Sequence, residues 1–226
     1  MSKGKLIVIE GTDCSGKETQ AKLLLERLKK DDIKIEERAF PMYDTPTGKI
    51  VGGSLLGKPH IGESFFGSDV SKLNPKVAAL YYAADRLYNI GEIEDLLNSG
   101  VNVILDRYVE SNMGHQAGKI KDKKEQVEMM KWLEKLEYEL LELPRPDLVI
   151  FLFMPYQYTI ELRNKRNEVA DEVEKNVDYL RNAEKTYSLM AEKYNYSIVH
   201  CVKYDKIRSI EDISDDVYKI VRDKLK

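Results

Sequence analysis

One short turn constrains this chain more than any other part of its sequence. An apolar run at residues 6–9, followed by Glu10, predicts a buried strand over residues 6–10. Residues 11–19, GTDCSGKET, follow it with the spacing GxxxxGK. Backbone N–H groups of such a loop, together with the N-terminus of the helix that follows, form a nest for phosphate groups. Lys17 would add a positive charge near the β- and γ-phosphates of a nucleotide. A glycine turn with a surface lysine is the alternative, but the preceding strand and following helix favour the phosphate loop.

The loop therefore predicts a nucleotide-binding site. Its candidate contacts to ATP are Gly11, Thr12, Asp13, Cys14, Ser15, Gly16, Lys17, Glu18 and Thr19.

Glu18 departs from the general pattern, which has a serine or threonine at this position to coordinate Mg²⁺. Thr19 comes one residue later and should point about 100° away around the helix. Negative charge is tolerated in the first turn of a helix. We expect Glu18 to turn away from the phosphates, which would leave Mg²⁺ held by phosphate oxygens and water.

Short β-branched runs alternate with helical segments along the whole chain, without an internal repeat or a linker. This alternation predicts one α/β domain with a mostly parallel sheet covered on both faces. Ligands bind such sheets at the carboxyl ends of the strands. The expected strands are residues 6–10, 33–39, 101–105, 148–154 and 197–202. The expected helices are residues 17–30, a short one near 47–56, then 74–97, 123–143, 177–194 and one from about 209.

Composition limits the functional classes. The 226 residues are 42% hydrophobic and 33% charged, with 36 basic and 39 acidic residues, so the net charge is −3. This balance is typical of a folded protein that binds neither nucleic acid nor a membrane surface. The longest apolar run, residues 148–154, is too short to span a bilayer. Cys14 and Cys201 lie far apart, and we expect a cytoplasmic protein without disulfides.

Two further segments suggest an acceptor site. Tyr82 and Arg86 are four residues apart on a predicted helix, where an aromatic ring and a guanidinium could hold a base. A core tyrosine with a surface ion pair fits that spacing equally well. Asp106 and Arg107 end a predicted strand, which places a carboxylate and a donor fork beside the phosphate loop. A simple salt bridge at the strand end is the alternative.

The motifs of this chain resemble those of the thymidylate kinases in both order and spacing. The matching segments are residues 10–13 (EGTD), 16–17 (GK), 40–41 (FP), 84–86 (ADR), 106–108 (DRY) with Ser111 and Gln116, and 143–147 (LPRPD). The resemblance covers nearly all of residues 1–226. It implies a P-loop nucleoside-monophosphate-kinase fold, with a five-stranded parallel sheet flanked by helices and a small mobile lid. It also implies a homodimer that converts ATP and dTMP to ADP and dTDP with Mg²⁺.

The resemblance further implies roles for individual residues. Tyr82 would lie on thymine, Arg86 would meet its exocyclic oxygen, and Asn112 would lie near the base edge. Asp13 would meet the 3′-hydroxyl, and Arg107 and Tyr43 would bind the acceptor phosphate. His115 stands where many relatives have tyrosine, near the 2′ position. The implied dTMP contacts are Asp13, Phe40, Pro41, Tyr43, Tyr82, Arg86, Arg107, Ser111, Asn112, His115 and Gln116. The implied metal residues are Asp106, acting through water, with Asp13 and Glu174 as further candidates.

The family's lid would lie at about residues 155–175. Relatives without an arginine in the phosphate loop supply it from the lid, and residues 11–17 contain no arginine. Phosphoryl transfer needs positive charge over the transferring group, which Arg163 or Arg166 would provide. Taken alone, this run is typical of a solvated helix face. The implied catalytic residues are Lys17, Asp106, Arg107, Arg163 and Arg166.

Three other functions compete with this one: a deoxynucleoside kinase, another nucleoside monophosphate kinase, and a non-catalytic nucleotide switch. A nucleoside kinase needs a general base to deprotonate a 5′-hydroxyl. After the second predicted strand, residues 39–43 contain no carboxylate before Asp44. This favours an acceptor that is already an anion. The switch is suggested only by Glu18.

Overall fold

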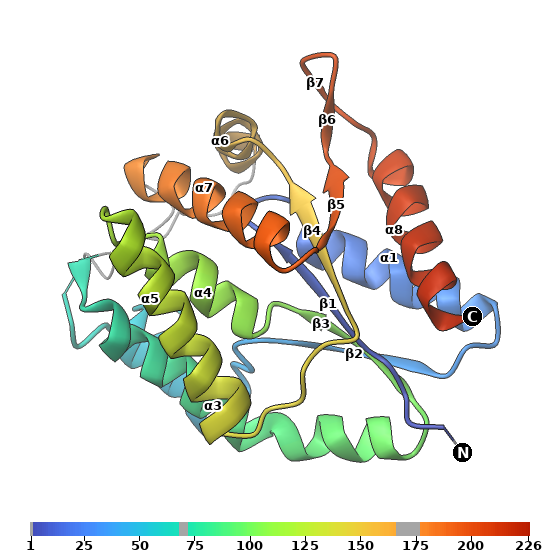
Figure 1. Ribbon diagram of the computed structural model, residues 1–226, viewed down its shortest axis with the longest axis horizontal. Helices are drawn as coiled ribbons and strands as arrows, with labels where there is room; N and C mark the ends of the chain where they lie inside the picture. The colour runs from blue at the N-terminus through green and yellow to red at the C-terminus, as the bar shows by residue number, and fades with distance from the viewer. Residues whose placement is uncertain (1, 68–71, 166–176) are drawn as a thin grey trace.

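A five-stranded parallel sheet forms the centre of the protein (Figure 1). The computed structural model describes residues 2–67, 72–165 and 177–226. The strand order is β2-β3-β1-β4-β5, so the first strand lies in the middle. These strands are β1 (Leu6–Gly11), β2 (Ile35–Ala39), β3 (Asn102–Asp106), β4 (Leu148–Phe153) and β5 (Ser197–His200). A separate antiparallel hairpin consists of β6 (Val202–Lys203) and β7 (Lys206–Ile207).

The strand register brings three chain segments together at one edge of the sheet. Asp106, the last residue of β3, lies opposite Ile9 of β1 and Ala39 of β2. Gly11 lies opposite Leu152 of β4. The phosphate loop, the segment after β2 and the segment after β3 therefore all begin at the carboxyl edge, where parallel sheets bind ligands.

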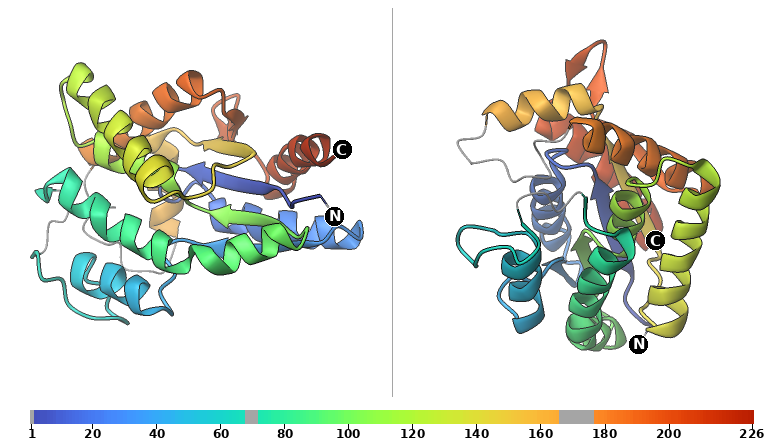
Figure 2. Two further views of the ribbon diagram at one scale, coloured as in Figure 1. Left: turned by 60° about the horizontal axis from the view of Figure 1, so that its bottom comes forward. Right: turned by 90° about the vertical axis from the view of Figure 1, so that its left-hand side faces the viewer.

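Helices cover both faces of the sheet (Figures 1 and 2). Helices α1 and α8 pack against each other on one face, and α3, α4, α5 and α7 contribute to the core on the other. The helices are α1 (Lys17–Lys30), α2 (Pro46–Lys49), α3 (Pro75–Asn98), α4 (Val109–Ala117), α5 (Lys123–Glu134), α6 (Tyr156–Lys165), α7 (Val177–Lys193) and α8 (Ile210–Leu225). Two π-helical segments, η1 (Ile50–Leu55) and η3 (Lys135–Leu140), continue α2 and α5.

Strand β1 is apolar on both faces because it lies in the middle of the sheet. Leu6 and Val8 pack into the core that includes α3, α4 and α5. Ile7 and Ile9 face the other way, into the core with α1 and α8. Alternating side chains of one strand thus help to form both hydrophobic cores.

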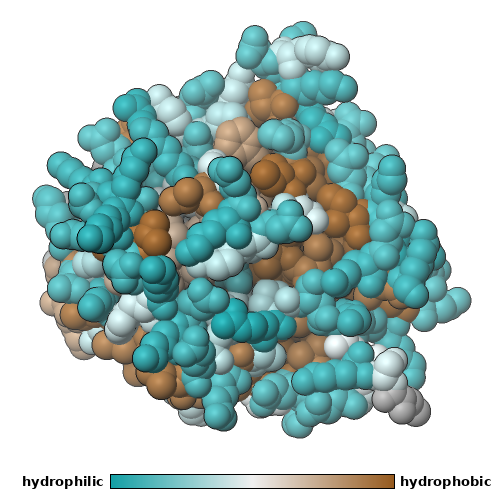
Figure 3. All heavy atoms as spheres, in the orientation of Figure 1, coloured by the Kyte–Doolittle hydropathy of each residue, from teal (hydrophilic) through white to brown (hydrophobic). Residues whose placement is uncertain are grey.

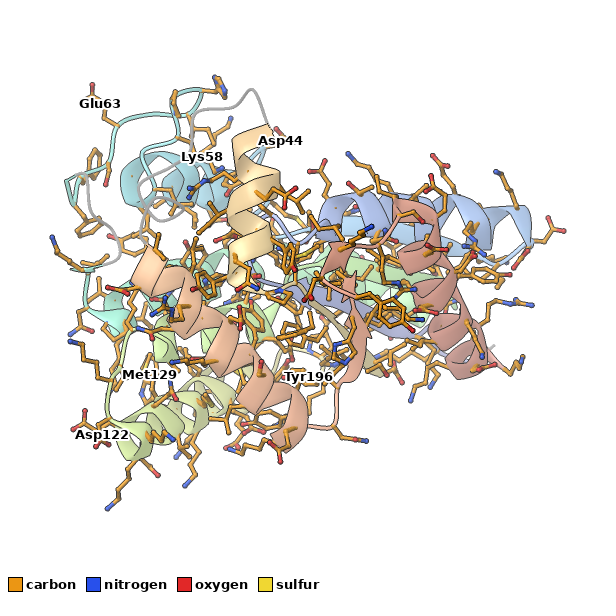
Figure 4. The ribbon with its side chains drawn as sticks, turned by 90° about the horizontal axis from the view of Figure 1, so that it is seen from above. Asp44, Lys58, Glu63, Asp122, Met129 and Tyr196 are labelled. Carbon is orange, nitrogen blue, oxygen red and sulfur yellow. The ribbon has the colours of Figure 1, made fainter. Side chains whose placement is uncertain are left out.

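The two termini lie near each other at the end of the molecule where β1 begins (Figure 2). On the face in Figure 3, polar residues cover most of the surface, and apolar residues gather over β4 and β5 between α7 and α8. In Figure 4, the segment with Asp44, Lys58 and Glu63 lies on one side of α7, and α5 with Asp122 and Met129 lies on the other. None of the helices in the described ranges is long and apolar enough to span a bilayer.

The observed sheet confirms the predicted five-stranded parallel architecture. The Asn74 side chain accepts a hydrogen bond from the N–H of Lys76 at the start of α3, as expected of a cap. Gly100 follows that helix with φ of 82°, which suits a helix stop.

Three elements differ from the sequence expectation. Helix α4 was not predicted, because its sequence VESNMGHQA contains several weak helix formers, and nearly all of it is buried in the fold. The helix expected over residues 123–143 is α-helical only to Glu134 and continues as η3. The last predicted strand ends at His200 and is followed by the β6–β7 hairpin.

Candidate active site at the carboxyl edge

The phosphate loop depends on two glycines for different reasons. Gly16 has φ of 88° at the start of α1, a conformation that residues with a side chain rarely adopt. A Cβ at Gly11 would lie 2.5 Å from Ser15 Oγ and 3.0 Å from the Leu152 carbonyl oxygen. The loop therefore packs directly against β4.

Lys17 is held inside the loop. Its Nζ donates to the Thr12 carbonyl oxygen at 2.8 Å, and its side chain is buried. Burial, together with the positive charge of Arg107, lowers the pKa of Lys17 to about 8, against the opposing effect of the nearby carboxylates. The hydroxyls of Thr12 and Ser15 are buried without a hydrogen-bond partner in the described residues. Such groups are suited to meet a ligand inserted in the loop.

Glu18 and Thr19 lie on the exposed side of the first turn of α1. Glu18 Oε1 accepts a hydrogen bond from Lys22 Nζ at 2.5 Å, and both side chains are well exposed. The Glu18 carboxylate, at the position where the general pattern has a metal-binding hydroxyl, is thus engaged in an i,i+4 pair with Lys22.

Arg107 connects the turn after β3 to the phosphate loop. Its guanidinium pairs with Asp13 through Nη2. Its Nη1 lies 3.4 Å from Ser111 Oγ and 3.3 Å from His115 Nε2. Burial alone would raise the pKa of Asp13, but the nearby positive charges, that of Arg107 foremost, hold it well below its ordinary value. Arg107 itself has φ of 68°.

Glu10 is a central residue of the site that the sequence analysis used only as part of a family motif. It is fully buried, and it accepts hydrogen bonds from the N–H of Tyr108 at 2.9 Å, Ser111 Oγ at 2.8 Å and the Tyr187 hydroxyl at 3.0 Å. Burial raises its pKa, although Arg107 acts in the opposite direction. Glu10 thus fixes the start of α4 next to the phosphate loop. A charged residue that ends a buried strand was the signal for this role.

His115 joins α4 to α7. Its Nδ1 lies 2.9 Å from the Tyr179 hydroxyl, and the two rings stack with centroids 5.7 Å apart. Burial, assisted by the charge of Arg107, lowers the pKa of His115 to about 4 despite the opposing charge of Asp13. The imidazole is therefore neutral at pH 7. Tyr179 and Tyr187 on α7 were not predicted as site residues, because their proximity arises only from long-range packing.

Asp106 ends β3 at the centre of the carboxyl edge. Its Oδ1 is buried and has no hydrogen-bond partner within the described ranges. Its negative charge acts on Lys17. Gln116 on α4 is also buried, and its Oε1 is likewise without a partner among the described residues.

The segment after β2 closes one side of the site. The Phe40–Pro41 peptide bond is cis, and Phe40 packs against Tyr108 with ring centroids 6.0 Å apart. The N–H of Met42 donates to Asp85 Oδ2 at 3.0 Å, so Asp85 of the ADR segment anchors this loop to α3. Lys58 Nζ lies 5.1 Å above the centre of the Tyr43 ring.

Tyr82 and Arg86 lie one turn apart on α3 but have different surroundings. Tyr82 is half-buried against the small cluster around Val51 and Leu55. Arg86 is buried, and its guanidinium pairs with Glu137 through Nε at 2.5 Å and Nη2 at 2.8 Å. The surface ion pair considered from the sequence is therefore wrong, since the partner of Arg86 is a buried glutamate from η3. Asn112 of α4 contacts the same glutamate at 2.9 Å.

The segment expected to form a lid, residues 155–175, lies only partly within the described residues. Arg163 lies on α6 and is partly exposed. Arg166 and Glu174 lie outside the described residues.

The strand order, with a phosphate loop after the central strand, defines a P-loop nucleotide-binding protein. A second set of polar residues lies at the same edge, where Arg107 contacts both Asp13 of the loop and Ser111 of α4. The comparisons agree with this class. The family model described as thymidylate kinase matches residues 9–213.

Individual relatives extend over the same length. A thymidylate kinase of Plasmodium falciparum is 29% identical over 219 residues, which cover 97% of this chain and 90% of that protein. A probable thymidylate kinase of Pyrococcus horikoshii is 32% identical over 225 residues, which cover 99% and 98%. The solved structure of a thymidylate kinase from Candida albicans superposes with a TM-score of 0.75 at 25% identity, covering all of this chain and 94% of that one. The chain belongs to the thymidylate kinase family.

Proposed function

We infer that the carboxyl edge carries out the family reaction, in which the γ-phosphoryl group of ATP is transferred to dTMP to give dTDP and ADP. The family match identifies the chain as an ATP-dependent kinase with these two substrates and favours none of the other classes considered. The observation that carries the site assignment is the contact between Arg107 and Asp13. This contact supports the assignment because Arg107, which we expect at the acceptor phosphate, lies beside the loop that we expect to hold ATP.

ATP would bind with its phosphates in the loop of residues 11–17. Backbone N–H groups and the start of α1 favour the negative charge. Lys17 would exchange its contact with the Thr12 carbonyl for the phosphate oxygens, where its positive charge is better compensated. The buried hydroxyls of Thr12 and Ser15 offer further donors.

The acceptor phosphate would bind at Arg107, with Tyr43 closing the same side. Arg107 presents a planar donor fork that matches phosphate oxygens. When the phosphate takes part of this fork, Asp13 becomes available to accept a hydrogen bond from the 3′-hydroxyl. The acceptor oxygen already carries negative charge, so the transfer requires positioning and charge stabilisation rather than a general base. Arg163 and Arg166 would add positive charge over the transferring group.

Mg²⁺ fits the carboxylate chemistry of this edge. It prefers oxygen ligands and retains several waters when it binds with substrate phosphates. Asp106 has a buried oxygen without a partner in the described part of the chain, and it is the residue we propose to hold the metal, through water. Asp13 and Glu174 remain further candidates. The bound ion would neutralise charge that develops between the β- and γ-phosphates.

We also propose that the protein is a homodimer, with α3 at the interface. Leu80, Leu87 and Tyr88 are 49%, 45% and 61% exposed, and Val77 also lies in this apolar stripe. Gly91 continues the stripe, and no neighbouring atom restricts it. An uncharged stripe of this length on a helix is typical of a protein–protein contact. Sedimentation of Leu80→Glu against the wild-type protein tests this: a dimeric wild type and a monomeric variant are expected, and a monomeric wild type would contradict it.

A cytoplasmic location completes the proposal. Both cysteines are buried as thiols, and burial raises the pKa of Cys201 to about 12. Buried thiols of this kind are typical of proteins from a reducing compartment.

The decisive experiment is a coupled assay of ADP release. Each nucleoside and each nucleoside monophosphate is offered as the acceptor with ATP and Mg²⁺. We expect turnover with dTMP and none with thymidine. Turnover with thymidine would instead establish a nucleoside kinase, and ATP binding without transfer to any acceptor would establish the nucleotide switch.

A further inference from the structure

Glu137 is the most deeply buried carboxylate beside the expected base site. Its exposed fraction is 0%, and it lies on η3, a segment with no expected contact to substrate. It meets Arg86 through both carboxylate oxygens and also accepts a hydrogen bond from Asn112 Nδ2 at 2.9 Å. One carboxylate therefore holds both residues that the family resemblance places at the base edge.

The contacts of Asn112 fix the direction of its side-chain amide. Nδ2 donates to the Ala79 carbonyl oxygen at 3.0 Å as well as to Glu137, so both of its hydrogens are used. The reverse orientation would place Oδ1 against two acceptors. Oδ1 therefore faces away from Glu137, and it is buried without a hydrogen-bond partner in the described residues. A buried amide oxygen of this kind is suited to accept a hydrogen bond from a ligand.

Arg86 is oriented by the same carboxylate. Glu137 takes donors on Nε and Nη2, which leaves the N–H groups of Nη1 for another acceptor. The side chain of Arg86 is only 3% exposed, and Glu137 compensates its charge. The guanidinium can thus present directed hydrogen-bond donors without an unpaired buried charge.

Oriented in this way, the pair consists of one acceptor and one set of donors. The base edge of thymine offers the complement: an N–H donor at N3 and an acceptor at O4. Cytosine offers the reverse, with a lone pair at N3 and an amino group at C4. A polar site built for one pattern rejects the other, because its buried groups would be left unpaired.

We propose that Glu137 is a positioning residue that makes the site specific for a thymine-type base over a cytosine-type base, by fixing the Asn112 oxygen as acceptor and the Arg86 guanidinium as donor. This inference rests on the proposed function, since it assumes that Arg86 and Asn112 face the base. Glu137 acts through these two residues and itself stays behind them.

The test compares kcat/KM for dTMP and dCMP in Glu137→Gln and in the wild-type protein. The new amide places an NH₂ group against Arg86 or Asn112, so one of them must turn. We expect the dTMP/dCMP ratio to fall at least about tenfold, mainly through a higher KM for dTMP, because a good bidentate contact to a base contributes about that much discrimination. The KM for ATP should not change. An unchanged ratio with lower overall activity would overturn the proposal and leave Glu137 a purely structural residue.

Glu110→Gln is the matched control. Glu110 is also a buried carboxylate, but its partner is the Tyr138 hydroxyl at 2.5 Å. The dTMP/dCMP ratio should be unaffected in this variant, and an equal fall would show a general effect of buried charge and overturn the proposal.

If Glu137→Gln does not fold, Glu137→Asp keeps the charge pair but shortens the reach, and the ratio is judged by the same criterion. A wild-type protein that phosphorylates no monophosphate would refute the proposed function itself, which is a different result from an unchanged ratio.

Discussion

Arg107 and Asp13 form an ion pair between segments that are 94 residues apart, which joins the turn after β3 to the phosphate loop. The pair keeps the guanidinium and the carboxylate ionised and oriented before any substrate binds. Substrate binding would then exchange one anionic partner of Arg107 for another, rather than desolvate a free charge. Such preorganisation reduces the cost of ordering the site.

Tyr82→Ala should weaken dTMP binding selectively. Loss of a ring stacked on a base costs on the order of 1–3 kcal/mol, so the KM for dTMP should rise about fivefold or more while the KM for ATP stays nearly constant. Steady-state kinetics with each substrate varied measures both values. Tyr81→Ala is the control, because Tyr81 packs on the same small cluster and against Phe66, with ring centroids 5.7 Å apart. If Tyr82→Ala weakens the binding of ATP as much as that of dTMP, Tyr82 is a core residue and does not stack on the base.

Arg163→Ala and Arg166→Ala test the lid. A guanidinium that contacts the phosphates mainly in the transition state affects kcat more than KM. At least one of these variants should lower kcat by about 10³, the lower range for an arginine finger. Lys123→Ala and Lys124→Ala, at the start of α5, remove charge elsewhere and should have little effect on kcat. Near-normal kcat in both arginine variants would contradict a catalytic role and favour the alternative, that this segment is a solvated helix face.

Glu18→Ser should retain or improve activity and lower the Mg²⁺ concentration needed for half-maximal rate. The serine would supply the hydroxyl of the general phosphate-loop pattern. Loss of the exposed contact with Lys22 should leave the free energy of unfolding nearly unchanged, because water screens such a pair. Lys22→Ala is the control for that contact and should leave the Mg²⁺ dependence unchanged. An inactive Glu18→Ser protein would contradict this prediction and indicate that the Glu18 carboxylate is itself a metal ligand.

Asp106→Asn should impair transfer severely, because it removes the negative charge at the buried oxygen proposed to orient the waters around Mg²⁺. Equilibrium binding of ATP without Mg²⁺ should change much less than kcat. A variant with normal kcat would exclude Asp106 from the metal environment.

His115 should make stability depend on pH. Its pKa is about 4 when folded and near 6.5 when unfolded, so the unfolded chain binds more protons between these values. Its contribution is complete above pH 6.5 and is lost as the pH falls towards 4, by about 2 kcal/mol between pH 7 and pH 5.

His115→Phe keeps a ring against Tyr179 but cannot be protonated. In urea unfolding at both pH values, the variant should lose about 2 kcal/mol less than the wild-type protein. Equal losses in the two proteins would mean that His115 titrates normally.

The order of elements could be read from the sequence because its signals are local. The phosphate loop lies between an apolar run and a helix, and Asn74 and Pro75 identify the start of α3 from adjacent residues. Helix α4 could not be recognised in this way. Its residues are weak helix formers, and its burial against neighbouring elements provides the stability that its propensity lacks.

The sequence by itself determined the sheet class, the phosphate loop and, through its family motifs, a set of candidate site residues. Only the tertiary structure decided what these residues contact. Glu10 accepts hydrogen bonds from Ser111 of α4 and Tyr187 of α7. Glu137 contacts Arg86, 51 residues away in the chain, and Asn112, 25 residues away. No local pattern specifies such partners, because a buried carboxylate is stabilised by whichever donors the packing of distant elements brings to it.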